Sequence, residues 1–211
     1  MKRINGHTAG LKPNQVRRLE YLQRRRVPPE MIITVELANQ ICDLSREIQR
    51  QVGVLINRAG RVVSVIVGGH DAITIPDMPD YRTVPGRLKG LRCIHTHLDR
   101  EPLTQDDFTD LALLYLDIMG VLTITPQGQM HRLHAGHILP GADNDAPYDL
   151  MAPLAPHELN IGFDDFMQAL ESELARRQSA ARTADSGERA ILVSVSTAPR
   201  RKARQSLAEL E

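Results

Sequence analysis

Two short runs rich in β-branched residues, Val52–Asn57 and Arg61–Val67, are separated only by Arg58-Ala59-Gly60. Valine and isoleucine favour strands, and a three-residue connection that contains glycine is typical of a hairpin. The sequence therefore predicts an antiparallel pair of buried strands in the first third of the chain.

The segments around this hairpin alternate between helical and strand patterns. A helix is expected from Thr34, a good N-cap residue, to about Gln51, because apolar residues recur along one helical face. Strands are expected at 91–95, 118–125 and 129–139, with a helix from Thr104 to about Asp117 between the first two. This order predicts an α/β fold with a central mixed sheet flanked by helices.

The remaining segments divide the chain into four parts. Residues 1–30 form a polar arm and a basic helix at 13–26, and residues 31–157 form the α/β domain, with a short strand at 72–75. Residues 158–187 hold a helix that starts at Asp164, and from 175 onward either a linker or the frayed end of that helix. Residues 188–211 contain a strand and a helix start without partners, so we expect them to open a further, truncated domain.

The composition limits the function classes. The chain has 211 residues, of which 42% are hydrophobic and 25% charged, as expected for a packed core. Aromatic residues make up 3%, which disfavours a base-stacking nucleic-acid platform. Cys42 and Cys93 lack motif spacing and are expected to be buried free thiols. With neither an 18-residue apolar run nor a signal peptide, we expect a cytoplasmic protein without membrane contact.

The formal net charge is zero, but basic residues gather at the two ends. Residues 1–30 hold eight basic and two acidic residues, whereas residues 31–175 hold ten and twenty. We therefore expect any polyanion to bind at the two basic ends of the chain. The residues that would contact RNA phosphates lie in and after the first helix: Arg17, Arg18, Arg24, Arg25 and Arg26. The alternative is that they form a solvated helix face.

His95-Thr96-His97 is the main candidate for chemistry. Side chains alternate along a strand, so the two imidazoles point to the same side. Asp107 lies at the start of the next predicted helix. Two histidines and a carboxylate can hold zinc and leave a fourth position open to water. Alternatively, His95 and His97 only form hydrogen bonds at a strand end, and Asp107 only caps a helix.

The order strand, His-x-His, loop and Thr104-x-x-Asp107 resembles the motif of the JAMM (MPN) metalloproteases, whose sheet and helix layers are like those of cytidine deaminases. The resemblance implies that His95, His97 and Asp107 hold zinc. Between His97 and Thr104 the chain has one residue fewer than the family has between its second histidine and its serine. Arg50 and Gln51 also stand where the family has its catalytic glutamate, and Glu47 is the nearest substitute.

As a whole, the sequence resembles the N-terminal extension found in long forms of the HflX family of GTPases. The stretches that carry this resemblance are Gly10-Leu11-Lys12-Pro13, Arg24–Pro29, Arg46–Ile56, His95–Leu98 and Asp110–Leu114, and they lie within residues 6–175. Residues 188–195 and 203–211 resemble the opening of that family's next domain.

The resemblance implies a parent protein that binds GTP, magnesium and the large ribosomal subunit or its rRNA. This chain contains no Gly-Lys dipeptide and hence no P-loop, so no GTP-binding residue can be assigned in it. Its own role is expected to be that of an accessory module, with the ribosome and its own GTPase domain as partners. The alternative function is a zinc-dependent peptidase or isopeptidase with Glu47 as the base.

Three further histidines, His131, His134 and His137, are spaced three residues apart on and after a predicted strand. Neighbours at that spacing fall on opposite faces of a regular strand. We therefore expect them to be separate surface or loop residues.

Overall fold

The computed structural model describes residues 4–81, 87–99, 101–139 and 148–184, with only the backbone from residue 178 onward. The chain divides into two compact units, residues 1–178 and 179–211. Of the second unit, only the helical residues 179–184 are described, so the strand and helix predicted at 188–211 lie outside the described residues. The fold below is that of the first unit.

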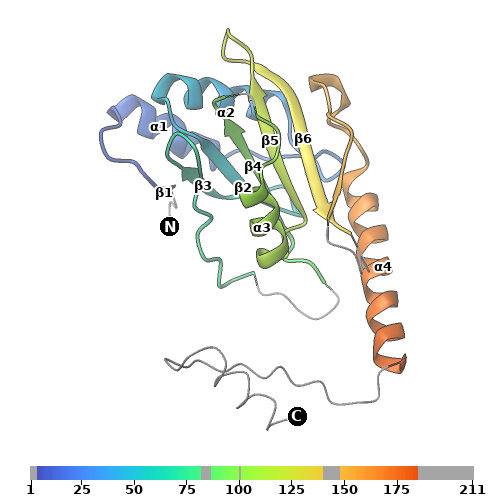
Figure 1. The fold of residues 1–211 in the computed structure, drawn as a ribbon. Helices are drawn as coiled ribbons and strands as arrows, with labels where there is room; N and C mark the ends of the chain where they lie inside the picture. Colours follow the sequence, from blue (N-terminus) through green and yellow to red (C-terminus); the bar gives the residue numbers. More distant parts are fainter. Residues whose placement is uncertain (1–3, 82–86, 100, 140–147, 185–211) are drawn as a thin grey trace, which may run out of the picture. The chain divides into compact units, whose positions relative to one another are not determined.

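A mixed seven-stranded sheet forms the centre of this unit (Figure 1). Its strands, in spatial order, are β1 (Ile4–Gly6), β3 (Val62–Val67), β2 (Val52–Asn57), β4 (Leu91–His97), β5 (Ile118–Ile124), β6 (Met130–Ile138) and β7 (Tyr148–Leu150). The pairs β1–β3 and β4–β5 are parallel, and the other neighbours are antiparallel. The predicted α/β class with a mixed sheet is thus confirmed.

Helices cover both faces of the sheet (Figure 1). On one face, α1 (Pro13–Leu22), α2 (Val35–Ile48) and the first turns of α4 (Phe163–Ala184) pack on a buried cluster that includes Leu19, Leu44 and Phe163. On the other face, α3 (Gln105–Leu114) covers a smaller cluster through Phe108 and Leu111. A single 3₁₀ turn, η1 (Pro156–Glu158), follows β7.

Several predicted elements are confirmed. The hairpin connects β2 and β3, and Thr34 caps α2 by accepting a hydrogen bond from the Leu37 amide at 3.3 Å. Strand β4 extends beyond its predicted end to His97, so both histidines lie within a regular strand. Cys42 and Cys93 are buried free thiols, and burial raises the pKa of both, that of Cys42 to about 12.

Other predictions are wrong. The first helix ends at Leu22 because the chain then turns, and the Val27 amide donates to the Gly60 carbonyl beside the hairpin. Residues 72–75 form no strand, since Ile73 and Ile75 pack on the smaller cluster without joining the sheet. The edge strands β1 and β7, three residues each, form in segments where the sequence predicts loop. Helix α4 continues to Ala184, so of the two alternatives for the segment after 175 the helix end is correct as far as residue 184.

A membrane-spanning helix is absent from the described part of the chain, where no helix is both long and apolar enough to cross a bilayer.

Candidate metal centre

The end of β4 presents its side chains alternately to the two faces of the sheet. His95 and His97 point to the face that α3 covers, and Thr96 points to the opposite face. There the Thr96 hydroxyl lies 2.6 Å from the Ser45 hydroxyl of α2 and accepts from the Val52 amide at 3.0 Å. Thr96 therefore anchors the stretch of backbone that carries both imidazoles.

Asp107 reaches the same face from the first turn of α3. Its Oδ2 accepts hydrogen bonds from the Thr104 amide at 2.7 Å and from the Thr104 hydroxyl at 2.8 Å, which completes a capping box. Its Oδ1 lies 3.1 Å from Nε2 of His95. The two roles considered for Asp107 are thus compatible, because Oδ2 caps the helix while Oδ1 faces His95.

The three side chains bring their donor atoms into one buried cluster. The two Nε2 atoms are 3.0 Å apart, and Nε2 of His97 lies 3.5 Å from Oδ2 of Asp107. His95 is fully buried, and His97 and Asp107 are 6% and 7% exposed. Ligands at the usual distances from a tetrahedral zinc ion are separated by about 3.3 Å, so a cluster of this size fits that ion.

The electrostatics favour a neutral imidazole beside an ionised carboxylate. Burial lowers the pKa of His97 and so does neighbouring His95, against the opposing effect of Asp107. Burial raises the pKa of Asp107, but hydrogen bonding and charge at His95, together with the bonds from Thr104, outweigh it and bring that pKa to about 2. Neutral imidazole and carboxylate are the forms that bind metal ions.

Two states satisfy this geometry. In one, a protonated imidazole donates to its neighbours, which is the purely hydrogen-bonded alternative. In the other, a cation takes the lone pairs of both Nε2 atoms and of Oδ1. Among the residues that the structure describes, the buried Nδ1 atoms of His95 and His97 have no hydrogen-bond partner, whereas the two Nε2 atoms contact each other and Asp107.

Glu47, the proposed substitute base, is held elsewhere. It lies on the outer surface of α2 and accepts hydrogen bonds from Gln15 and Arg18 of α1. Within the described ranges, the groups that could share a metal ion with His95 are His97 and Asp107. The structure thus brings together the three predicted ligands but does not bring Glu47 to them.

The five arginines of the first basic segment divide into two sets. Arg18 forms ion pairs with Asp43 and Glu47, and Arg25 pairs with Glu36 and stacks over the Tyr21 ring at 4.8 Å. These two arginines connect α1 and the segment after it to α2. The other three, Arg17, Arg24 and Arg26, are exposed.

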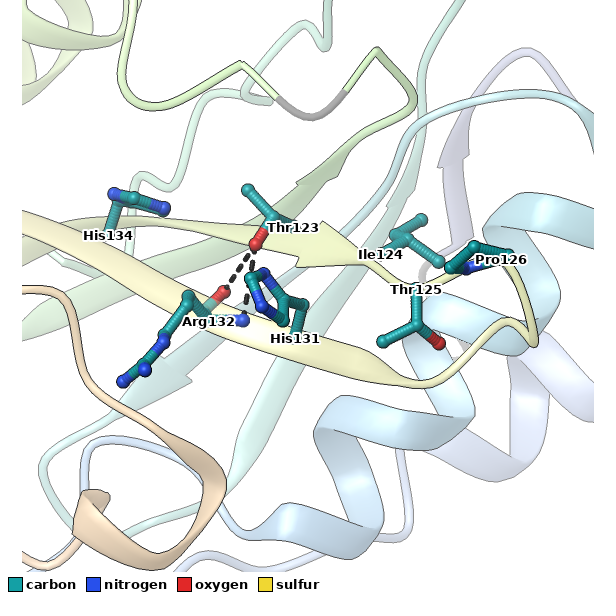
Figure 2. Close-up of a pocket in the computed structure, with 7 residues that line it drawn as sticks. All are labelled: Thr123, Ile124, Thr125, Pro126, His131, Arg132 and His134. Carbon is teal, nitrogen blue, oxygen red and sulfur yellow. Dashed lines mark hydrogen bonds between the residues drawn. The ribbon is translucent and has the colours of Figure 1, made fainter.

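A hollow of about 410 Å³ lies over the end of β5 and the start of β6 (Figure 2). Thr123, the register partner of His97 on β5, lines it together with His131 and His134 of β6. The prediction that these two histidines fall on opposite faces is wrong, because a bulge at Thr123/Ile124 inserts an extra residue opposite β5. Burial lowers the pKa of His134, and nearby His131 and Arg132 lower it further.

A second, exposed group of side chains consists of His70, Asp71 and Asp99. Nδ1 of His70 lies 2.7 Å from Asp71 and 3.9 Å from Asp99, and these contacts raise the pKa of His70. Asp99 follows His97 by two residues, so this acidic group stands at the same end of β4 as the buried cluster. Its charge would attract a cation towards that end.

Comparison with known proteins adds no relative: no protein-family model matches this chain, and no curated protein or solved structure matches it.

Proposed function

We propose that this chain is a zinc-binding α/β module that acts by binding rather than by hydrolysis. We further propose that it is the N-terminal accessory region of an HflX-like, ribosome-associated GTPase. The observation that carries the zinc proposal is the convergence of His95 Nε2, His97 Nε2 and Asp107 Oδ1 within one buried cluster.

The donor set favours zinc over other cations. Two imidazole nitrogens and one carboxylate oxygen are typical of zinc sites with one open position, whereas calcium and magnesium prefer sites made of oxygen atoms. The ion would supply positive charge and Lewis acidity at this end of β4. His95 and His97 would be held by the strand and by Thr96, and Asp107 by its capping box.

Binding is favoured over hydrolysis because a zinc hydrolase needs a proton acceptor next to the bound water. Glu47 is engaged by Arg18 and Gln15 on the outer surface of α2. Arg50 and Gln51 stand where the JAMM family has glutamate, and neither a guanidinium nor an amide can take up a proton at neutral pH. A JAMM-like domain without this carboxylate fits an accessory role.

The sequence resemblance to the long HflX forms supports a GTPase parent, and the mixed α/β sheet is consistent with the JAMM-like domain expected within it. In this proposal GTP and magnesium are bound by the parent protein, outside this chain. The exposed Arg17, Arg24 and Arg26 are available to contact rRNA phosphates, whereas Arg18 and Arg25 have structural ion pairs.

Co-sedimentation with large ribosomal subunits tests the ribosome proposal. Reversing Arg17, Arg24 and Arg26 to glutamate should weaken binding and flatten its salt dependence, because each phosphate contact releases counterions. Arg46→Glu, also on an exposed face, is the control and should bind like the wild type. Equal binding by the triple variant and the wild type would contradict the proposal.

Anomalous diffraction at the zinc edge tests the metal proposal directly. Crystals grown with zinc should show one strong peak about 2.0–2.2 Å from His95 Nε2, His97 Nε2 and Asp107 Oδ1. A peak only at the exposed group of His70, Asp71 and Asp99 would contradict it.

A second candidate function, a zinc-dependent peptidase or isopeptidase, is favoured by one observation. His95, His97 and Asp107, the three ligand positions of the JAMM motif, lie together in one buried cluster. Zinc-loaded protein should then cleave linear or isopeptide-linked peptides, and His95→Ala should abolish cleavage. Absence of cleavage by the fully zinc-loaded wild type would eliminate this function.

A further inference from the structure

Gln51 lies directly before β2, on the face of the sheet that carries the histidines. Its neighbours two and four residues on, Gly53 and Leu55, belong to that face, since Leu55 packs in the cluster beneath α3. The Gln51 backbone continues the β2–β3 ladder, because its amide donates to the Gly69 carbonyl and its carbonyl accepts from the Gly68 amide, both at 2.8 Å.

The register places Gln51 opposite His97. Gly53 is the partner of His95 in the antiparallel pair of β2 and β4. Extending this register by two residues sets Gln51, just before β2, opposite His97 at the end of β4. Between these two positions the Thr96 hydroxyl bonds the Val52 amide in place of a backbone carbonyl.

Gln51 is also one of the few polar side chains buried without a partner. It is 3% exposed, and its Oε1 has no hydrogen-bond partner in the described structure. An unpaired buried amide oxygen costs about 1–3 kcal/mol, so a partner that is bound only part of the time would explain its presence. The other such atoms on this face are the two Nδ1 atoms of the histidine pair.

We propose that Gln51 is a positioning residue of the metal centre, whose amide hydrogen-bonds the molecule in the open fourth position beside His97. This inference depends on the zinc-binding function proposed above. An amide both donates and accepts hydrogen bonds, so Gln51 can orient water or a carbonyl oxygen there. Because it cannot accept a proton, it holds that ligand without activating it.

Two substitutions of similar size separate this role from a packing role. Gln51→Met removes the amide and should weaken zinc binding about tenfold, as is typical when a partner in the outer shell of a metal is lost. Gln51→Glu adds a carboxylate and should tighten zinc binding by a similar factor. Gln129→Leu, an exposed glutamine on the β5–β6 turn, is the control and should leave affinity unchanged.

Zinc affinity is measured by competition with a chromophoric chelator, and the cobalt(II)-loaded proteins are compared by visible absorption. The inference expects shifted cobalt bands in both Gln51 variants and wild-type bands in the control. If the wild type binds one zinc ion and both Gln51 variants match it in affinity and bands, the role of Gln51 is overturned while the zinc function stands. If the wild type binds no zinc, both are overturned.

Discussion

Nε2 of His95 lies 3.0 Å from Nε2 of His97 in a cluster that is closed on its third side by Asp107. Two neutral imidazole lone pairs at this separation repel each other unless a proton or a cation lies between them. Asp107 is ionised, so its charge stabilises either a divalent cation or a proton shared by the two imidazoles, and the metal content of the chain distinguishes the two states.

Asp107→Asn should separate the capping role from the ligand role. The amide oxygen can still accept from Thr104, but the charge beside His95 is lost, so the free energy of unfolding without metal should fall by about 1–3 kcal/mol. Zinc binding should weaken by more than about tenfold, because the substitution removes a charged group that binds the ion directly, not one that only hydrogen-bonds a ligand. Chelator competition measures the affinity, with Asp106→Asn on the exposed side of the same helical turn as control.

Gly53→Ala should disturb the metal centre, because Gly53 on β2 lies opposite His95 on β4. A Cβ at this position would lie 3.0 Å from Cβ of His95, so β2 and β4 would have to shift apart. We expect a loss of about 1–3 kcal/mol in the free energy of unfolding, together with weaker zinc binding. At Gly69 a Cβ would meet only the Ala72 carbonyl, at 3.9 Å, so Gly69→Ala should have little effect. Equal losses in both variants would argue against this explanation.

Thr96→Val should weaken the anchor on the opposite face. The substitution leaves the buried Val52 amide and Ser45 hydroxyl without their Thr96 partner, which should cost about 1–3 kcal/mol. Zinc affinity should fall as well, because the backbone that carries both imidazoles is less restrained. Chemical denaturation with and without zinc measures both effects, and Thr74→Val at an exposed position is the control.

Glu171→Gln tests an ion-pair network that fixes α4 to the sheet. Glu171 accepts from Arg58 at 2.9 Å and from the Leu88 amide at 3.1 Å, while Arg58 also pairs with buried Asp117 at 2.7 Å. Burial raises the pKa of Glu171, but these bonds outweigh it and hold the pKa below its ordinary value of 4.5. The substitution should cost about 1–2 kcal/mol at pH 7.

The pH dependence of that cost has a definite sign. A carboxyl group whose pKa is lowered by folding stabilises the protein fully above its unfolded pKa. The difference between wild type and Glu171→Gln should therefore be constant near neutral pH and shrink as pH falls below about 4.5. Denaturant titrations at pH 7 and pH 3.5 measure it, and a difference that grows on acidification would contradict this account.

The sequence could predict features that depend on local periodicity. Alternation along β4 correctly placed His95 and His97 on one face, and the spacing from Thr104 correctly gave Asp107 a capping geometry. Glu47 could not be judged from sequence, because its engagement by Arg18 depends on how α1 packs on α2. The bulge that brings His131 and His134 to one hollow has no signal in the spacing of these histidines.

Gln51 shows where such reasoning stops. The sequence sets Arg50 and Gln51 together at the glutamate position of the motif without distinguishing them. The burial of Gln51 and its unpaired oxygen follow from how β2, β3 and β4 meet. The short edge strands β1 and β7 were missed for a related reason, since three residues carry too little periodicity to separate a strand from a loop.

The measurement that tests the central claim most directly is the zinc content of the purified chain after exposure to zinc and removal of the excess. The account predicts one equivalent per chain in the wild type and none in a His95→Ala/His97→Ala variant that remains folded by circular dichroism. A wild-type protein without zinc, or equal zinc in the double variant, would contradict it.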